Sequence, residues 1–70
     1  MIKMGVYKHY KGNLYEAVNI VVHSETLEKM VLYRAIEDEQ NFWVRPLSMW
    51  NNIIDVAGKQ LKRFEFVDNK

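Results

Sequence analysis

The most constraining feature of this sequence is the absence of cysteine from a chain of only 70 residues. Chains of this size bury a modest share of their surface, and many rely on disulfides or on zinc held by thiolates. Neither is available here, and the two histidines cannot complete a tetrahedral zinc site. We therefore expect no metal and no cofactor. The core must come from aromatic, Val, Ile and Leu side chains.

Composition is typical of a globular domain, because 49% of the residues are hydrophobic and the formal net charge is only +1. Length predicts one domain over residues 1–70, with a folded core at about 5–67. No apolar run is long enough to cross a membrane, and Lys3, Lys8 and His9 interrupt the first ten residues, so no signal peptide is visible. Together with the lack of cysteine, these features favour a reducing, cytoplasmic location.

Charge is unevenly distributed along the chain. Residues 1–15 carry three lysines and no acid, residues 16–40 carry six acids and two bases, and residues 41–70 carry five bases and three acids. A nucleic-acid surface normally requires a strongly basic face, which this mixed pattern does not supply. We therefore favour a protein or peptide partner over a nucleic acid, and we expect weak, salt-sensitive binding to random DNA.

Turn signals and β-branched residues divide much of the chain into short strands. Gly12-Asn13 is a strong turn signal between two apolar runs, and Pro46 closes another run because proline cannot donate to a β-ladder. Ala57-Gly58 marks a further turn. The expected strands are 6–10, 14–22, 42–45, 53–56 and 61–67.

Two segments admit more than one secondary structure. The run 30–36 has the features of a returning hairpin strand, but Ser24 could equally cap a helix over 24–36. Pro46 favours a single helical turn near 46–50, and a longer helix would extend to residue 57. The residues alone therefore leave two alternatives, an all-β chain and an α+β chain with helices near 24–36 and 46–57.

Several motifs, in order along the chain, resemble the bacterial domain-of-unknown-function 1653 family. The stretch 43–50, Trp-Val-Arg-Pro-Leu-Ser-Met-Trp, is the most characteristic, although relatives usually have Phe where Trp50 stands. The remaining motifs lie at 7–15, at 23–26, at 31–35 and at Gly58 followed by Arg63-Phe64. The resemblance covers residues 5 to about 66 and carries no established activity.

This resemblance implies an all-β fold, a small SH3-like barrel of five or six short strands with one helical turn near 46–50. It therefore resolves the segment 27–36 in favour of a strand. One departure concerns the last hairpin, where relatives tend to place an acidic residue or Asn before the turn glycine and this chain has Ala57. Because alanine tolerates the left-handed backbone of a tight turn poorly, we expect a looser hairpin there.

His9 and His23 are the only side chains whose ordinary pKa lies near neutral pH. His23-Ser24-Glu25 contains the residue types of a catalytic triad, but three consecutive residues of an extended chain cannot converge on one substrate. A hydrogen-bonded turn explains this segment better. The chain also has no phosphate-binding glycine loop. We therefore expect no enzymatic activity, and a small His-dependent enzyme is the alternative.

Nine aromatic side chains (two Trp, four Tyr and three Phe) exceed what a barrel of this size encloses easily, so some must reach the surface. Tyr, Trp and Arg side chains dominate the energetics of many interfaces. We predict a binding surface drawn from separate segments: Tyr7, His9, Tyr33, Trp43, Arg45 and Trp50. In the competing interpretation Trp43 and Trp50 fill the core. Arg45 then pairs with an acid, such as Glu16 or Glu25.

These features favour a non-catalytic binding module that presents a Tyr/Trp/Arg surface to a protein, a peptide or a nucleic-acid strand. A second hypothesis is a homo-oligomeric structural unit, in which the same aromatic surface forms a homodimer interface. The two hypotheses differ in whether the surface is free in solution, which light scattering would measure.

Overall fold

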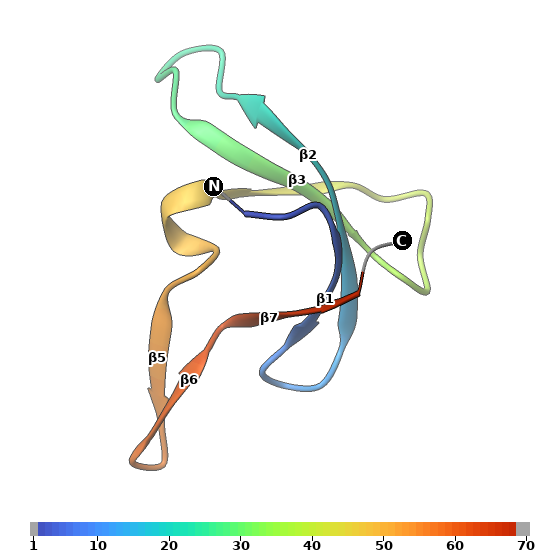
Figure 1. Cartoon of the computed structure of the whole chain (residues 1–70). Helices are drawn as coiled ribbons and strands as arrows, with labels where there is room; N and C mark the ends of the chain where they lie inside the picture. The colour runs from blue at the N-terminus through green and yellow to red at the C-terminus, as the bar shows by residue number, and fades with distance from the viewer. Residues whose placement is uncertain (1, 69–70) are drawn as a thin grey trace.

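The computed structural model describes residues 2–68, which form seven short β-strands and one 3₁₀ helix (Figure 1). The elements are β1 (Gly5–His9), β2 (Leu14–Val22), β3 (Lys29–Ala35), β4 (Trp43–Pro46), η1 (Leu47–Met49), β5 (Ile53–Val56), β6 (Lys59–Lys62) and β7 (Phe64–Asp68). The predicted all-β class and the helical turn near 46–50 are confirmed. The alternative with helices near 24–36 and 46–57 is wrong.

The strands form an open arrangement rather than the closed barrel that the resemblance implied. Five strands make an antiparallel sheet in the order β4-β3-β2-β1-β7, and β5 and β6 pair only with each other. Strands β4 and β7 are therefore the two edges of the larger sheet. In Figure 1 the β5–β6 hairpin projects away from that sheet, on the same side as η1.

The chain has one strand more than the five or six predicted, because the expected strand 61–67 is divided at Arg63. The backbone N–H of Arg63 donates to the carbonyl oxygen of Asn52 at 3.1 Å, outside both ladders. On one side of this break β6 pairs with β5, and on the other side β7 pairs with β1. A single residue thus transfers the chain from the hairpin to the main sheet.

The β1–β2 and β5–β6 hairpins turn at the positions predicted from the sequence, and the residues of each turn explain its geometry. Gly12 has a φ of 109°, and its N–H donates to the carbonyl oxygen of His9 at 2.7 Å, which closes the β1–β2 connection. Between β5 and β6, Val56 pairs with Lys59, so only Ala57 and Gly58 form the turn. Both have left-handed φ values, 52° and 82°. The expectation of a looser hairpin at Ala57 is wrong, since the turn is tight and its alanine is strained.

The segment 23–28 is a side-chain-stabilised turn, as predicted. The Nδ1 atom of His23 accepts hydrogen bonds from the backbone N–H groups of Glu25 and Thr26, at 3.1 and 3.3 Å. The hydroxyl of Thr26 accepts the N–H of Glu28 at 3.2 Å. His23 therefore has a structural role in the β2–β3 connection.

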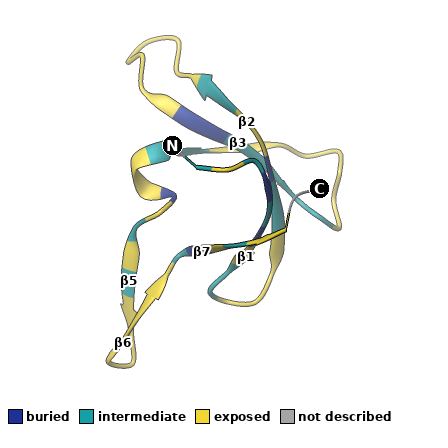
Figure 2. Ribbon diagram, in the orientation of Figure 1, coloured by how far each residue is buried: buried dark blue, intermediate teal, exposed yellow. Residues whose placement is uncertain are grey.

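The core is small and contains residues from four strands of the main sheet, together with one residue that follows η1 (Figure 2). Its buried members are Tyr7, Ala17, Val31, Trp50 and Phe64. Within residues 2–68 no helix is long and apolar enough to span a membrane.

Candidate functional site

One face of the main sheet carries five of the six residues predicted for the binding surface. Directly opposed residues in an antiparallel ladder, and residues two apart on one strand, point to the same face. The register pairs Tyr7 with Tyr15, and it pairs Tyr33 with Trp43. The sheet therefore gathers side chains from β1, β3 and β4 on one face: Tyr7, His9, Tyr33, Trp43 and Arg45.

The centre of this face is an aromatic stack. Trp50 and Phe64 lie parallel, with ring centroids 4.0 Å apart and planes 2° from parallel. Both side chains are buried, with exposed fractions of 0% and 2%. Trp50, which we predicted for the binding surface, thus lies in the core, as the competing interpretation held. A ligand can reach its indole only if the covering groups move.

Tyr7 is also a core residue. Its exposed fraction is 4%, and its ring makes edge contacts with Trp50 and Phe66 at centroid distances of 5.3 and 5.4 Å. Its hydroxyl donates to the carbonyl oxygen of Lys3 at 2.7 Å. Burial raises the pKa of this phenol. The indole Nε1 of Trp50 is buried next to it without a hydrogen-bond partner in the described chain.

Arg45 lies against the rim of this core. Its guanidinium carbon is 5.5 Å from the centroid of the Phe64 ring, a cation–π contact. Its Nε atom is buried and has no hydrogen-bond partner. Among residues 2–68 no carboxylate lies within ion-pair distance of Arg45, and in particular Glu16 and Glu25 are not its partners. Its terminal nitrogens make no hydrogen bond in this part of the chain and, unlike Nε, remain in contact with solvent.

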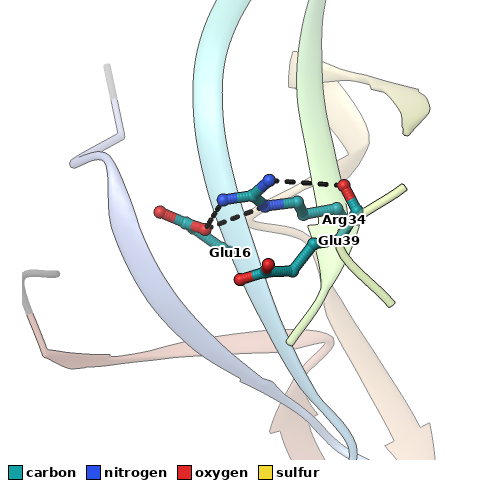
Figure 3. Close-up of polar contacts among 3 residues, drawn as sticks. All are labelled: Glu16, Arg34 and Glu39. Atoms are coloured by element: carbon teal, nitrogen blue, oxygen red, sulfur yellow. Dashed lines mark hydrogen bonds and ion pairs between the residues drawn. The ribbon is translucent and has the colours of Figure 1, made fainter. Parts of the chain in front are cut away.

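Arg34, on the neighbouring strand β3, differs from Arg45 because its guanidinium nitrogens all have hydrogen-bond acceptors. Its Nε and Nη2 atoms donate to one carboxylate oxygen of Glu16 at 3.0 and 2.9 Å, and Nη1 donates to the carbonyl oxygen of Glu39 at 3.4 Å (Figure 3). Its guanidinium also lies 5.4 Å from the Phe42 ring centroid. Glu16, one of the two acids that the competing interpretation paired with Arg45, is thus paired with Arg34 on the neighbouring strand.

His9 is half-buried next to Phe64. Its ring centroid lies 5.0 Å from that of Phe64 and 4.5 Å from that of Tyr10. Its Nδ1 atom accepts the backbone N–H of Lys11 at 3.2 Å, which requires the neutral ring to carry its proton on Nε2. Burial lowers the pKa of His9, and the positive charges of Arg45, Arg63 and Lys11 lower it further. Both effects favour the neutral form of His9.

Two of the cations around His9 were not among the predicted site residues. Arg63 precedes β7, and its Nε donates to the side-chain oxygen of Asn52 at 3.1 Å, so an uncharged group holds it in place. Lys11 lies in the β1–β2 turn, with its ammonium 5.9 Å from the Tyr10 ring centroid. Neither forms an ion pair with an acid of the described chain. Arg63 and Phe64 stood together in the motif noted in the sequence, which was the signal available for both.

Tyr33 and Trp43 complete the face at its β3–β4 side. Tyr33 is half-buried and makes edge contacts with Tyr15, Trp50 and Phe64 at centroid distances of 5.6, 5.1 and 6.0 Å. Trp43, opposite Tyr33 on the edge strand, is 59% exposed. Trp43 is therefore the exposed aromatic side chain of the predicted set. Tyr33, its partner in the β-ladder, contacts the buried rings.

Two surface hollows flank the β1–β2 turn. One, of about 250 Å³, lies beside His9 and is lined by Lys8, His9, Tyr10, Leu61, Lys62 and Glu65. The other, of about 300 Å³, is lined by Gly12, Asn13, Leu14, Tyr15, Ala35, Ile36 and Glu37. In the described part of the chain no three His, Cys, Asp or Glu side chains are grouped as a metal site would require.

Comparison with known proteins identifies the family. The model of a protein family of unknown function, DUF1653, matches residues 5–66. The chain belongs to this family. A crystal structure of a DUF1653 protein from Bordetella bronchiseptica is 31% identical to it and covers 99% of this chain and 91% of that one, with a TM-score of 0.88. Comparison with curated proteins gave no match. The resemblance noted from the sequence is therefore confirmed.

Proposed function

We propose that this DUF1653 domain is a non-catalytic binding module whose ligand surface, the Arg45 face, consists of His9, Tyr33, Trp43, Arg45 and Arg63. The observation that carries the proposal is the state of Arg45. Its guanidinium is held against Phe64, its Nε is buried without a partner, and no acid of the described chain neutralises it. A buried donor left unsatisfied costs about 1–3 kcal/mol. The terminal nitrogens of the same guanidinium also lack a protein partner within residues 2–68, and they are the donors that a ligand would meet.

A peptide or protein segment fits this surface better than a nucleic acid. The exposed Trp43 ring and the neighbouring guanidinium are the groups on which protein interfaces concentrate their binding energy. The net charge of +1 supplies little of the phosphate attraction on which nucleic-acid affinity depends.

The geometry of the histidines argues for binding rather than catalysis. Nδ1 of His9 is held by the N–H of Lys11, and Nδ1 of His23 is held by the N–H groups of Glu25 and Thr26. In residues 2–68 neither imidazole is hydrogen-bonded to a carboxylate or hydroxyl side chain, which a general base normally needs for orientation.

Peptide display tests this proposal directly. Random peptides are selected on the immobilised wild-type domain and counter-selected on Arg45→Met, which keeps an aliphatic stem for packing but removes the guanidinium. We expect peptides that bind the wild type and are lost on the variant. Equal enrichment on both proteins, or no enrichment on either, would argue against the Arg45 face as a ligand surface.

A homo-oligomer is the second candidate, and one observation favours it. Strand β4 is a sheet edge. The residue before it and its first two residues are apolar and about half exposed: Phe42 (48%), Trp43 (59%) and Val44 (53%). Unpaired sheet edges with apolar side chains readily pair with another chain. Light scattering at several concentrations separates the candidates, because a stable dimer that Trp43→Lys dissociates would assign this surface to self-association.

A further inference from the structure

The inference made here rests on the proposed function and specifies the chemistry of its ligand. We propose that the Arg45 face recognises a carboxylate of the partner peptide, bound by the terminal nitrogens of Arg45 beside the His9 ring.

Three cations lie around His9. The His9 ring packs against Phe64, which the Arg45 guanidinium also contacts and which Arg63 directly precedes, and against Tyr10, which the Lys11 ammonium contacts. Arg45 comes from β4, Arg63 immediately precedes β7, and Lys11 lies in the β1–β2 turn. Within residues 2–68 the ion pair closer than 4.0 Å joins Arg34 of β3 to Glu16 of β2 and does not involve these three cations. Since three uncompensated cations repel one another, a bound anion would lower the electrostatic energy of the site.

The setting of Arg45 favours a planar anion. Its guanidinium lies against the Phe64 ring, and Phe64 is itself fixed by the 4.0 Å stack with Trp50. A guanidinium held in this way presents its terminal N–H groups as a rigid fork, which matches the two oxygens of a carboxylate. The neighbouring aromatic groups of Tyr33 and Trp43 suit the apolar part of a peptide chain.

A carboxylate also fits better than a phosphate on grounds of charge. A phosphate monoester carries about −1.5 to −2 at neutral pH, and three strong acceptor oxygens. One negative charge matches the single guanidinium of Arg45, and Arg63 already donates its Nε to Asn52.

His9 reports on the occupancy of this position. The groups that face it are Arg45 of β4, Arg63 before β7, Lys11 and Tyr10 of the turn, Tyr15 of β2 and Phe64 of β7, while Lys8, Lys62 and Glu65 line the adjoining hollow. A carboxylate bound among them would favour the imidazolium form. We therefore expect the pKa of His9 to rise when the site is filled.

The experiment uses NMR titration of the full chain with four probes. These are acetate, inorganic phosphate, a capped Gly-Glu-Gly peptide amide and its Gln counterpart. Acetylated Gly-Gly-Gly with a free carboxyl end is added as a further arm, because a partner could supply the carboxylate from a side chain or from its C-terminus. The signals followed are Hε–Nε of Arg45 and the imidazole of His9.

We expect acetate and at least one carboxylate peptide to shift both signals in a saturable manner, and the Gln peptide to leave them unchanged. The pKa of His9 should rise on saturation. Arg45→Met should weaken binding by about tenfold or more, the loss expected for a charge-assisted bidentate contact. Lys59→Met removes one exposed positive charge next to the turn of the β5–β6 hairpin and should leave binding unchanged.

Several results would overturn the inference. Equal binding of the Glu and Gln peptides, or an equal loss in Arg45→Met and Lys59→Met, would show that no specific carboxylate contact exists. Binding of phosphate without acetate would replace a carboxylate site with a phosphate site. If Arg45→Met does not fold, Arg45→Lys serves instead, because it keeps the charge and loses the fork.

The outcomes also separate this inference from the proposed function. Peptides that bind the Arg45 face without regard to charge would support a binding module and refute carboxylate recognition. Saturable binding of acetate with no peptide selected by display would support the carboxylate site and refute the peptide-binding role.

Discussion

Trp50 and Phe64 stack face to face, 4.0 Å apart, and join the segment after η1 to the last strand of the sheet. The pair lies between Tyr7 on one strand and Arg45 on another, so core and candidate site share the same ring, Phe64. Loss of either stacked partner should therefore affect both stability and binding.

The first prediction concerns this pair. Trp50→Ala removes a fully buried indole and should cost about 3–5 kcal/mol, comparable to the whole stability of a small domain. Trp43→Ala, which truncates the exposed indole of the same face, should cost less than about 1 kcal/mol. Urea unfolding followed by circular dichroism compares the two variants. A Trp50→Ala protein as stable as Trp43→Ala would contradict the stacked core.

The second prediction concerns pH. Because the pKa of His9 is lowered in the folded chain, the unfolded chain binds more protons below the ordinary value of 6.5. The free energy of unfolding should therefore be highest above that value and decrease as the pH falls through the lowered pKa. His9→Asn can still accept the Lys11 N–H but does not titrate, and it should flatten this part of the profile.

A measurement of the His9 pKa by NMR checks the same prediction independently. The pKa of Asp38 is also lowered, by hydrogen bonds from Asn41 and Gln40, but its effect lies below the ordinary aspartate value of 3.8. A His9 pKa at or above its ordinary value would show that burial and the neighbouring cations do not act as described.

The third prediction concerns the β5–β6 turn. Ala57 has a φ of 52°, in a region that costs a residue with a Cβ atom about 1–2 kcal/mol. Ala57→Gly should therefore stabilise the domain by about 0.5–1 kcal/mol after the extra chain entropy of glycine is included. Gly58→Ala should destabilise it, because Gly58 has a φ of 82° and its Cβ position is otherwise open. Thermal unfolding should resolve changes of this size, and shifts in the reverse directions would rule out the tight turn.

The fourth prediction concerns nucleic acid. With a net charge of +1, the domain should bind random duplex DNA more weakly than about 10⁻⁴ M at physiological salt, with affinity falling further as salt increases. Fluorescence anisotropy with a labelled duplex measures this. Tight binding that persists at physiological salt would mean that the cations near His9 act on phosphates.

Local signals predicted most strand positions. Gly12-Asn13, the β-branched run of β2 and Pro46 each act through neighbouring residues, and the strands end close to where these residues stand. The division of 61–67 could not be foreseen in the same way. Alternation continues through Arg63, and the break depends on a hydrogen bond to Asn52, which lies eleven residues earlier in the chain.

The candidate site was only partly predictable. Strand periodicity could place Tyr7, His9, Tyr33, Trp43 and Arg45 on one face, but it could not distinguish the buried Tyr7 from the exposed Trp43. That difference depends on where Trp50 lies after η1, which is a tertiary contact. The sequence marks Phe64 only as a strand residue. Its central role depends on tertiary contacts with β1, β2, β3 and β4 and with the segment after η1.

The pairing of β7 with β1 has a consequence for the order of folding. Strands β1 to β4 form successive hairpins from local contacts, whereas β1 meets β7 only after a loop of more than fifty residues closes, as the register of Val6 with Asp68 shows. Phe64 lies on β7, so the aromatic core cannot assemble before that strand arrives. During synthesis strands β1 to β4 must therefore leave the ribosome with their apolar face uncovered. We expect the nascent chain to remain a chaperone substrate until β7 emerges.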